Sequence, residues 1–276
     1  MRPMHRADLA IRELLHRCHG IDADLFDPAF FHTVMQRRMH AVECATSEDY
    51  GRLLAASSEE AKRLHEQLTI HYSEFMRNTL TFAVLEKLVI PALVQKKREE
   101  GKKELRVWSA ACAAGQEAYS LAMLLEEHVA AVGHGLQYRI FATDQDEAQI
   151  ALAQKARYAA SAVQNLTVKQ LARWFTRSGA SYVLDAVLQS RVESSVFNLL
   201  DDHLQVPPAS IFGNFDLVFC ANLLFYYADD AQERILHKVA RSLAPGGCLV
   251  TGDAERAALS RLGYQEMVPL SAVFRL

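Results

Sequence analysis

The segment RVWSAACAAGQEAYSLAMLL, residues 106–125, joins an apolar strand to an apolar helix through a turn with almost no side chains. The turn runs from Ala110 to Gly115 and contains only alanine, cysteine and glycine. Small residues at such a turn let a ligand approach the backbone closely, and the helix that follows offers free N–H groups. The sequence therefore predicts a ligand-binding turn, with an ordinary tight turn between a strand and a helix as the alternative.

An acidic residue, Asp144, ends the next apolar run, QYRIFATD at residues 137–144. An acid at the carboxyl end of that strand is placed to accept hydrogen bonds from ribose hydroxyls. Together with the small-residue turn, Asp144 predicts a nucleoside-bearing cofactor at the point where the strand order of a sheet reverses.

The turn also indicates which cofactor would fit. A dinucleotide site uses the pattern G-x-G-x-x-G, and of these glycines only Gly115 is present. Glu117 stands at the start of the following helix, where its carboxylate would repel a pyrophosphate and attract an ammonium or a sulfonium. S-adenosylmethionine carries both of these cations and no phosphate. The sequence therefore favours a methyl donor over NAD, and it disfavours a nicotinamide-dependent oxidoreductase.

The composition excludes other classes of protein. A net charge of -3 and a pI near 6.4 over 276 residues argue against a dedicated nucleic-acid-binding protein. The five cysteines are scattered and form no CxxC pair, so we expect reduced thiols and no metal site. Residues 1–20 lack the apolar core of a signal peptide, and no apolar run approaches the roughly 20 residues that span a bilayer. We therefore expect a soluble, cytoplasmic protein.

The periodicity of apolar residues divides the chain into a helical part and an α/β part. Residues 1–80 predict a helical N-terminal domain, with helices over 7–19, 27–45, 47–57 and 58–78. Gly20 is expected to cap the first helix, and Asp27 with Pro28 is expected to begin the second. Residues 81–103 predict a linker whose helix ends at Pro91 and continues as a charged, solvated segment.

From residue 104 onward, short apolar runs alternate with helical segments, which is typical of a parallel sheet with crossover helices. The predicted strands are 104–111, 137–144, 195–200, 215–222 and 246–253. Between residues 158 and 195 the alternation stops, and a helix-like run with two short antiparallel segments predicts a small inserted subdomain.

Several segments in addition to the turn resemble the CheR-type chemotaxis methyltransferases, which methylate glutamates of chemoreceptors with S-adenosylmethionine. They are IRELLHRCHGI (11–21), VMQRRM (34–39), SEFMRN (73–78), FATDQDEAQIALAQKARY (141–158) and FDLVFCANLLFYYADDAQERILHKVARSLAPGGCLVTGDAE (215–255). The resemblance covers about residues 8–256. It implies an α/β fold with a Rossmann-like methyltransferase domain over residues 104–276, a small inserted β subdomain and an all-α N-terminal domain.

The resemblance also implies the roles of particular residues. Glu117 would bind the methionine amine and Asp144 the ribose. Arg77 and Tyr226 would lie beside the transferred methyl group, where Arg77 can hold an acceptor carboxylate and Tyr226 can add a hydrogen bond. The remaining cofactor-binding residues implied are His71, Ser73, Ala111, Gly115, Asn198, Leu199, Cys220, Ala221 and Asn222.

Arg37 and Arg38, with His40, are predicted to form a basic face that docks acidic helices of a chemoreceptor. More ordinary roles remain open for Arg37, Arg38, Arg77 and Tyr226. The Arg37–Arg38 pair would then be simply solvated, Arg77 would form a surface salt bridge, and Tyr226 would be a packing residue.

Several positions depart from the family pattern, among them His71 and Ser73, which stand where the family usually has Asn and Thr. Ala111 replaces a glycine, Gln116 replaces an acid and Ala221 replaces an arginine. These departures leave two alternatives open, a CheR-like methyltransferase with a different protein or small-molecule acceptor and a cofactor-binding module without turnover.

Overall fold

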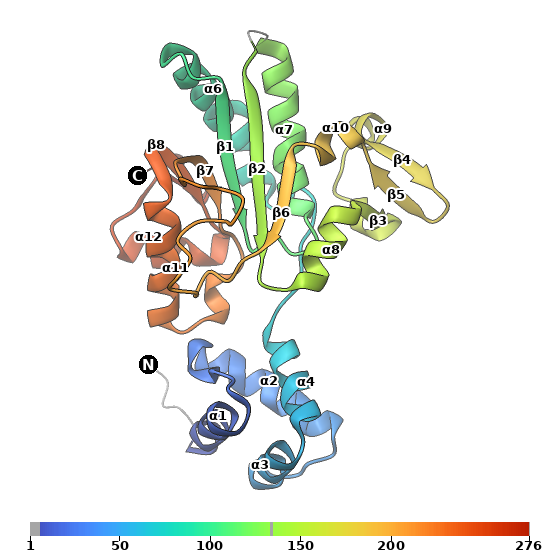
Figure 1. Ribbon diagram of the computed structural model, residues 1–276, viewed down its shortest axis with the longest axis vertical. Coiled ribbons are helices and arrows are strands. Elements are labelled where there is room, and N and C mark those ends of the chain that lie inside the picture. The colour runs from blue at the N-terminus through green and yellow to red at the C-terminus, as the bar shows by residue number, and fades with distance from the viewer. Residues whose placement is uncertain (1–5, 133–134, 276) are drawn as a thin grey trace. The chain divides into compact units, whose positions relative to one another are not determined.

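The computed structural model describes residues 6–132 and 135–275, which form two compact units (Figure 1). The helical unit comprises the chain up to Ile70 together with Leu224–Arg234. The α/β unit comprises His71–Leu223 together with the chain from Ile235 on. The domain boundaries at residues 80 and 103 remain a prediction.

The helical unit begins with four helices whose ends carry the expected capping residues. Gly20 follows the first helix with φ +66°, a conformation that glycine adopts without strain. The Asp27 side chain accepts hydrogen bonds from the N–H groups of Ala29 and Phe30, and Pro28 occupies the first helical position. Both capping predictions are confirmed. The helices are α1 (Arg6–His19), α2 (Pro28–Ala41), α3 (Ser47–Ala56) and α4 (Ser58–Leu68).

One of the two arginines predicted to form a docking face is buried, and that part of the prediction is wrong. Arg38 is 9% exposed, and its guanidinium donates to both carboxylate oxygens of Glu60 at 2.9 and 2.5 Å. The hydroxyl of Tyr50 also donates to Glu60, at 2.9 Å. Arg37 is exposed, because successive residues of a helix point in different directions. Arg38 therefore stabilises the core of the helical unit and is not available to a partner.

The helix predicted over residues 58–78 ends ten residues early, at Leu68. The segment that follows carries Phe75, which is fully buried and lies edge-on to the rings of Tyr158 and Phe175 at 4.9 and 5.5 Å between centroids. Met76, the next residue, has φ +51°, which no helix contains. Burial of Phe75 in the α/β unit therefore outweighs the helical preference of the local sequence.

The predicted solvated linker is also wrong, because the chain stays helical past Pro91. Helix α5 (Thr79–Val84) continues through a π-helical stretch (Leu85–Val89) into α6 (Ile90–Glu99). Proline lacks an N–H group and crowds the preceding turn, and the wider π turn accommodates it. Lys97 is 6% exposed and pairs with Asp216 at 2.8 Å, so this charged segment packs on the sheet.

A seven-stranded sheet forms the centre of the α/β unit, in the order β6-β2-β1-β7-β8-β10-β9. The first five strands in this order are parallel, and β10 runs antiparallel to both neighbours. The strands are β1 (Glu104–Ala110), β2 (Gln137–Asp144), β6 (Val192–Val196), β7 (Phe215–Phe219), β8 (Leu243–Val250), β9 (Gln265–Glu266) and β10 (Val273–Arg275). The order reverses between β1 and β7, and ligands of open α/β sheets bind at the carboxyl ends of such strands.

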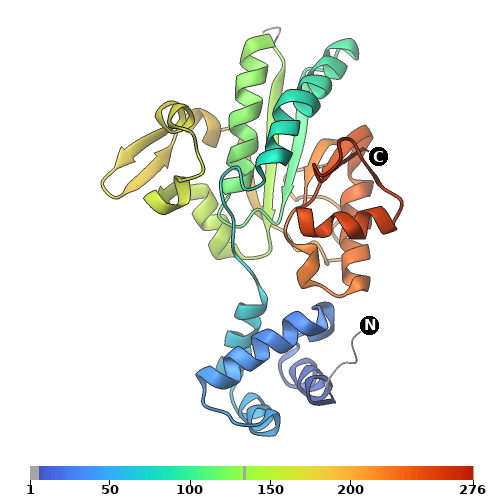
Figure 2. The ribbon, with the colours of Figure 1, turned by 180° about the vertical axis from the view of Figure 1, so that it is seen from behind.

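The strand predicted at 195–200 is shifted, because β6 ends at Val196 and Phe197 begins a loop. The other four predicted strands correspond to β1, β2, β7 and β8. Further helices are α7 (Gln116–Val132), α8 (Glu147–Lys155), α11 (Asp229–Arg241) and α12 (Arg256–Arg261). Figure 2 shows α6 and α7 side by side on one face of the sheet.

The structure has the small antiparallel sheet expected between residues 158 and 195, although residues 192–195 belong to β6 of the main sheet; the bounds of a subdomain remain a prediction. Its three strands form a separate antiparallel sheet in the order β3-β5-β4. Its elements are β3 (Arg157–Ala159), α9 (Val168–Trp174), β4 (Phe175–Ser178), β5 (Ser181–Leu184) and α10 (Ala186–Gln189). Across the described residues, none of the helices has both the length and the apolar character needed to cross a membrane.

The contrast between Arg37 and Arg38 yields a stability prediction. Arg38→Met leaves the Glu60 carboxylate buried without its cation and is expected to lower the free energy of unfolding by about 3 kcal/mol or more. Arg37→Met removes the same charge from an exposed position and is expected to change it by less than about 0.5 kcal/mol. Urea unfolding followed by circular dichroism measures both. Equal effects of the two substitutions would contradict the buried ion pair.

Candidate functional site

The turn between β1 and α7 has an unusual backbone. Ala111 and Ala113 have φ +59° and +46°, and Gly115 has φ +87°. The turn is bonded to the end of β2, because Cys112 N–H donates to the Thr143 carbonyl at 2.9 Å and Ala113 N–H donates to Asp144 Oδ2 at 2.9 Å. Side chains larger than a methyl group are more strained in this left-handed region, which explains the composition of the turn.

Gly115 is required by its surroundings as well as by its backbone. A Cβ atom there would lie 3.0 Å from the Cβ of Ala153 on α8 and 3.2 Å from the ring of Tyr119. The helix that follows the turn therefore packs against α8 at a distance that only glycine permits.

Asp144 braces the turn. It is 7% exposed, and besides the bond from Ala113 its Oδ1 accepts a hydrogen bond from Asp146 N–H at 3.0 Å. Burial raises the pKa of Asp144, and the two backbone donors oppose this. Each carboxylate oxygen has a second lone pair, so a bond to a ribose hydroxyl remains compatible with this geometry.

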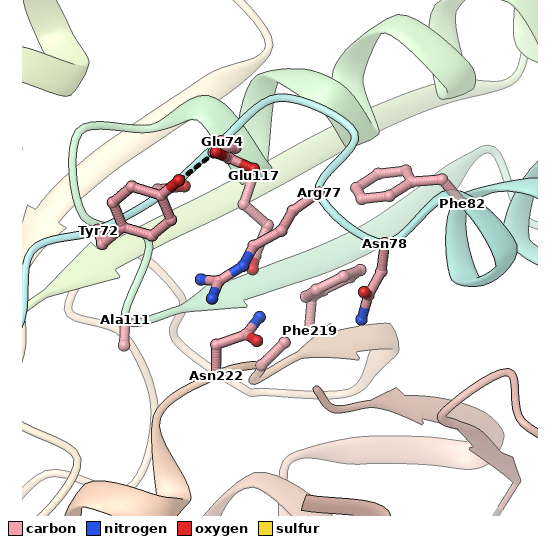
Figure 3. A pocket seen from close by; sticks show the side chains of 11 residues that line it. Tyr72, Glu74, Arg77, Asn78, Phe82, Ala111, Glu117, Phe219 and Asn222 are labelled. Atoms are coloured by element: carbon pink, nitrogen blue, oxygen red, sulfur yellow. Dashed lines mark hydrogen bonds between the residues drawn. The ribbon is translucent and has the colours of Figure 1, made fainter. Parts of the chain in front are cut away.

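A pocket lies at the carboxyl ends of β1 and β7, where the strand order reverses (Figure 3). Six predicted site residues come together there: Ser73, Arg77, Ala111, Glu117, Ala221 and Asn222. The other residues that line the pocket are Tyr72, Glu74, Asn78, Phe82 and Phe219.

Glu117 is the acid of this pocket. Its side chain is half-buried and accepts a hydrogen bond from the Ser109 hydroxyl at 2.6 Å. Burial raises its pKa well above the ordinary value, and the charge of Glu255 raises it further, whereas Ser109 and Arg77 lower it. An ionised Glu117 is therefore destabilised in the ligand-free pocket, and a cation placed beside it would be bound favourably.

Arg77 reaches the pocket from the segment that precedes α5. Its guanidinium carbon lies 5.0 Å from the centre of the Tyr72 ring, and in Figure 3 the guanidinium points towards Asn222. The neighbouring Met76 N–H donates to the hydroxyl of Ser120 on α7 at 3.0 Å. This bond fixes the backbone next to Arg77, although Arg77 itself lies outside any helix.

The other predicted site residues are placed differently. His71 Nε2 lies 3.0 Å from Asp146 Oδ2, next to the Asp144 loop. Cys220 is fully buried, and burial raises the pKa of its thiol well above the ordinary value, which disfavours the thiolate form that a nucleophile needs. Leu199 is buried, and Asn198 is exposed with its side chain bonded to the N–H of Leu200.

Tyr226 belongs to the helical unit, where its ring lies 4.9 Å from that of Phe30. Its predicted place beside the methyl group therefore remains a prediction.

Two contributors to the site were missed from the sequence. Tyr158, in the inserted subdomain, donates its hydroxyl hydrogen to the Ala114 carbonyl at 2.9 Å and so holds the turn. Glu255 accepts backbone hydrogen bonds from the loop that carries Asn222. Both residues lie in segments whose resemblance to the family was noted, but spacing in the sequence gives no sign of which distant backbone group a side chain reaches.

The strained turn predicts opposite stability changes for two alanine-to-glycine substitutions. Ala111→Gly removes a Cβ from a left-handed position and is expected to raise the free energy of unfolding by about 0.5 kcal/mol, after the greater chain entropy of glycine is subtracted. Ala110→Gly, one residue earlier in β1, is expected to lower it by about 1 kcal/mol because strand backbone needs no glycine. Thermal unfolding of the two variants checks this. A loss of stability in both would contradict the strain.

Glu117 yields a prediction that depends on pH. A carboxyl whose pKa is raised on folding destabilises the fold as the pH rises through its titration range, and this effect disappears at low pH. Glu117→Gln is therefore expected to stabilise the ligand-free protein near pH 8, on the order of 1 kcal/mol, and less near pH 5. Urea unfolding at both pH values measures the difference. If Glu117→Gln stabilises the protein equally at both pH values, the charge of the carboxylate is not the cause of the stabilisation.

Comparison with known proteins identifies the family. A family model described as CheR methyltransferase, SAM binding domain, matches residues 71–273. Chemotaxis protein methyltransferase 1 of Pseudomonas aeruginosa is 33% identical over 75% of this chain and 73% of that protein. Chemotaxis protein methyltransferase Cher2 of Pseudomonas putida is 33% identical over 69% of this chain and 67% of that protein. An uncharacterized 104.1 kDa protein of Rhodobacter capsulatus is 32% identical over 83% of this chain, which spans 23% of that longer protein.

The family match includes the turn, the pocket and every α/β-unit residue predicted for the site. It confirms the resemblance inferred from the sequence. The chain therefore belongs to the CheR family of S-adenosylmethionine-dependent methyltransferases.

Proposed function

We propose that this protein transfers a methyl group from S-adenosylmethionine to glutamate side-chain carboxylates of chemoreceptors. The proposal depends on one observation: the pocket combines a half-buried carboxylate, Glu117, with a guanidinium, Arg77. The carboxylate suits a cationic cofactor, and the guanidinium suits an anionic acceptor.

The residues of the pocket and of the adjoining β1–α7 turn fit S-adenosylmethionine. Glu117 is suited to an ammonium, and Asp144 retains lone pairs for ribose hydroxyls. Among the described residues, Gln116 Oε1 is buried without a hydrogen-bond partner, at the first position of α7 beside Glu117. A buried acceptor without a partner is costly, so a donor supplied by a ligand would be favourable there.

The chemistry requires alignment more than proton transfer. S-adenosylmethionine, when bound, supplies a methyl group made electrophilic by its sulfonium. The acceptor glutamate has an ordinary pKa of about 4.3 and is ionised at neutral pH, so no residue of this chain has to remove a proton. Arg77 holds the acceptor carboxylate through its planar fork and brings it into line with the methyl group. The neighbouring apolar side chains Phe82 and Phe219 help to exclude water.

A different acceptor is the second candidate function, and Ala221 is the observation that favours it. Ala221 lines the pocket at a position where the family resemblance implies an arginine. The pocket therefore has less positive charge for an acceptor carboxylate than that resemblance implies. The lower positive charge suits an acceptor whose binding depends less on ion pairing than the binding of a receptor glutamate does.

The partner surface that we propose lies on α2 of the helical unit. Arg37 and His40 are both exposed on this helix, whereas Arg38 is not. Because Arg37 is exposed, its charge can attract an acidic receptor helix without any rearrangement of the core. The proposed docking face therefore contains Arg37 and His40 only.

Binding and turnover test the proposed function separately. We expect calorimetry to detect binding of S-adenosylhomocysteine. With methyl-labelled donor and a chemoreceptor cytoplasmic fragment, we expect label that alkali releases as methanol, because carboxyl methyl esters are base-labile. Label that resists alkali would favour the different acceptor. Binding without any transfer of label would favour a module without turnover, and absence of binding would refute the proposal.

Arg77 yields the prediction for the chemical step. Arg77→Met is expected to lower kcat by about 100-fold or more, because a positioned charge that orients the acceptor is lost. It is expected to change the affinity for S-adenosylhomocysteine by only a few-fold. Lys87→Met, which removes an exposed positive charge in the π-helical stretch, is the matched control and should leave both values unchanged. A normal kcat in Arg77→Met would exclude Arg77 from the reaction.

A further inference from the structure

One carboxylate, that of Glu255, accepts hydrogen bonds from three backbone N–H groups. Gly252 and Asn222 donate to Oε2 at 2.6 and 2.9 Å, and Leu223 donates to Oε1 at 2.6 Å. Glu255 is 2% exposed and ends a short 3-10 helix, Asp253–Glu255, after β8. The donors come from two loops, so this side chain joins the loop after β7 to the loop after β8.

The loop after β7, which Glu255 joins to the loop after β8, has a strained backbone where it lines the pocket. Asn222 lines the pocket and has φ +60°, which is costly for a residue other than glycine. A Cβ atom at Gly252 would lie 2.9 Å from both the backbone nitrogen and Oδ1 of Asn222. Gly252 thus lets the two loops approach each other closely at Asn222, and Glu255 holds them together with charge-assisted hydrogen bonds.

We propose that Glu255 is a positioning residue of the cofactor pocket, which holds Asn222 in its pocket-lining conformation. The proposal rests on the proposed binding of S-adenosylmethionine. This role requires no contact between Glu255 and the cofactor. Nothing in the methyl-transfer chemistry described above depends on Glu255, so the proposal adds a residue to the site.

The electrostatic part follows from the charged groups around Glu117. Arg77 lines the same pocket from the segment before α5, and the Ser109 hydroxyl of β1 donates to Glu117. Glu255, after β8, acts on Glu117 through its charge. Two buried thiols, Cys112 and Cys220, also lie within electrostatic reach of Glu117. Among these groups Glu255 raises the pKa of Glu117, and Arg77 lowers it. Loss of the Glu255 charge would therefore let Glu117 ionise at lower pH.

Glu255→Gln separates a positioning role from a merely structural one. The amide has a nitrogen where the carboxylate has an oxygen, so at least one of the three donors loses its acceptor. We expect affinity for S-adenosylhomocysteine to fall by about tenfold or more near neutral pH. We expect KM for S-adenosylmethionine to rise more than kcat falls. The pH midpoint of S-adenosylhomocysteine binding should move to lower pH than in the unchanged protein.

Glu266→Gln is the matched control. Glu266, in β9, also accepts two backbone N–H bonds, from Leu270 and Ala272, and pairs with Arg256. It is not among the residues that line the pocket. We expect this substitution to lower stability and to leave the affinity for S-adenosylhomocysteine and its pH midpoint unchanged.

Glu255→Asp keeps the charge but shortens the reach, and it serves if the glutamine variant does not fold. It should weaken S-adenosylhomocysteine binding through Asn222 while the pH midpoint stays where it is in the unchanged protein. Normal affinity in a folded Glu255 variant, with stability lost as in Glu266→Gln, would overturn the proposal. Absence of binding by the unchanged protein would instead refute the proposed function itself.

Discussion

The site depends on the bonding of the β1–α7 turn to the end of β2. Two N–H groups of that turn are satisfied by Thr143 and Asp144, and a carbonyl of the turn accepts the hydroxyl of Tyr158. These bonds offset the cost of two alanines at positive φ. They also direct the start of α7, so that Glu117 lies in the pocket. Without these hydrogen bonds the turn would have buried polar groups that lack a partner, and Glu117 would lose its position in the pocket.

The electrostatics of the pocket favours ligand binding at the expense of the ligand-free fold. Glu117 is half-buried, and a second acid, Glu255, lies near enough to raise its pKa. Arg77 opposes this only in part. A pocket with such a balance is better matched to a cation than to water, because the ligand supplies the charge that the protein lacks. Enzymes commonly accept reduced stability at sites of this kind.

Arg77 reaches the pocket because the chain leaves α4 at Leu68 and does not resume a helix until Thr79. The stretch between them is held by the buried ring of Phe75 and by the bond from Met76 N–H to Ser120. A continuous helix through this stretch, as its composition suggests, would turn Arg77 to a different direction. Long-range burial of one aromatic ring thus decides where the charge of Arg77 lies.

The sequence by itself determined the alternation of strands and helices, the small antiparallel sheet, the small-residue turn and the two acids Glu117 and Asp144. These follow from local patterns, since periodicity and turn chemistry involve residues near each other in the chain. Only the tertiary structure decided that Arg38 is buried against Glu60, that Pro91 lies within a helix and that Glu255 holds the Asn222 loop. Each of these depends on a partner or a packing surface distant in sequence, whose position arises only when the sheet and the helices assemble.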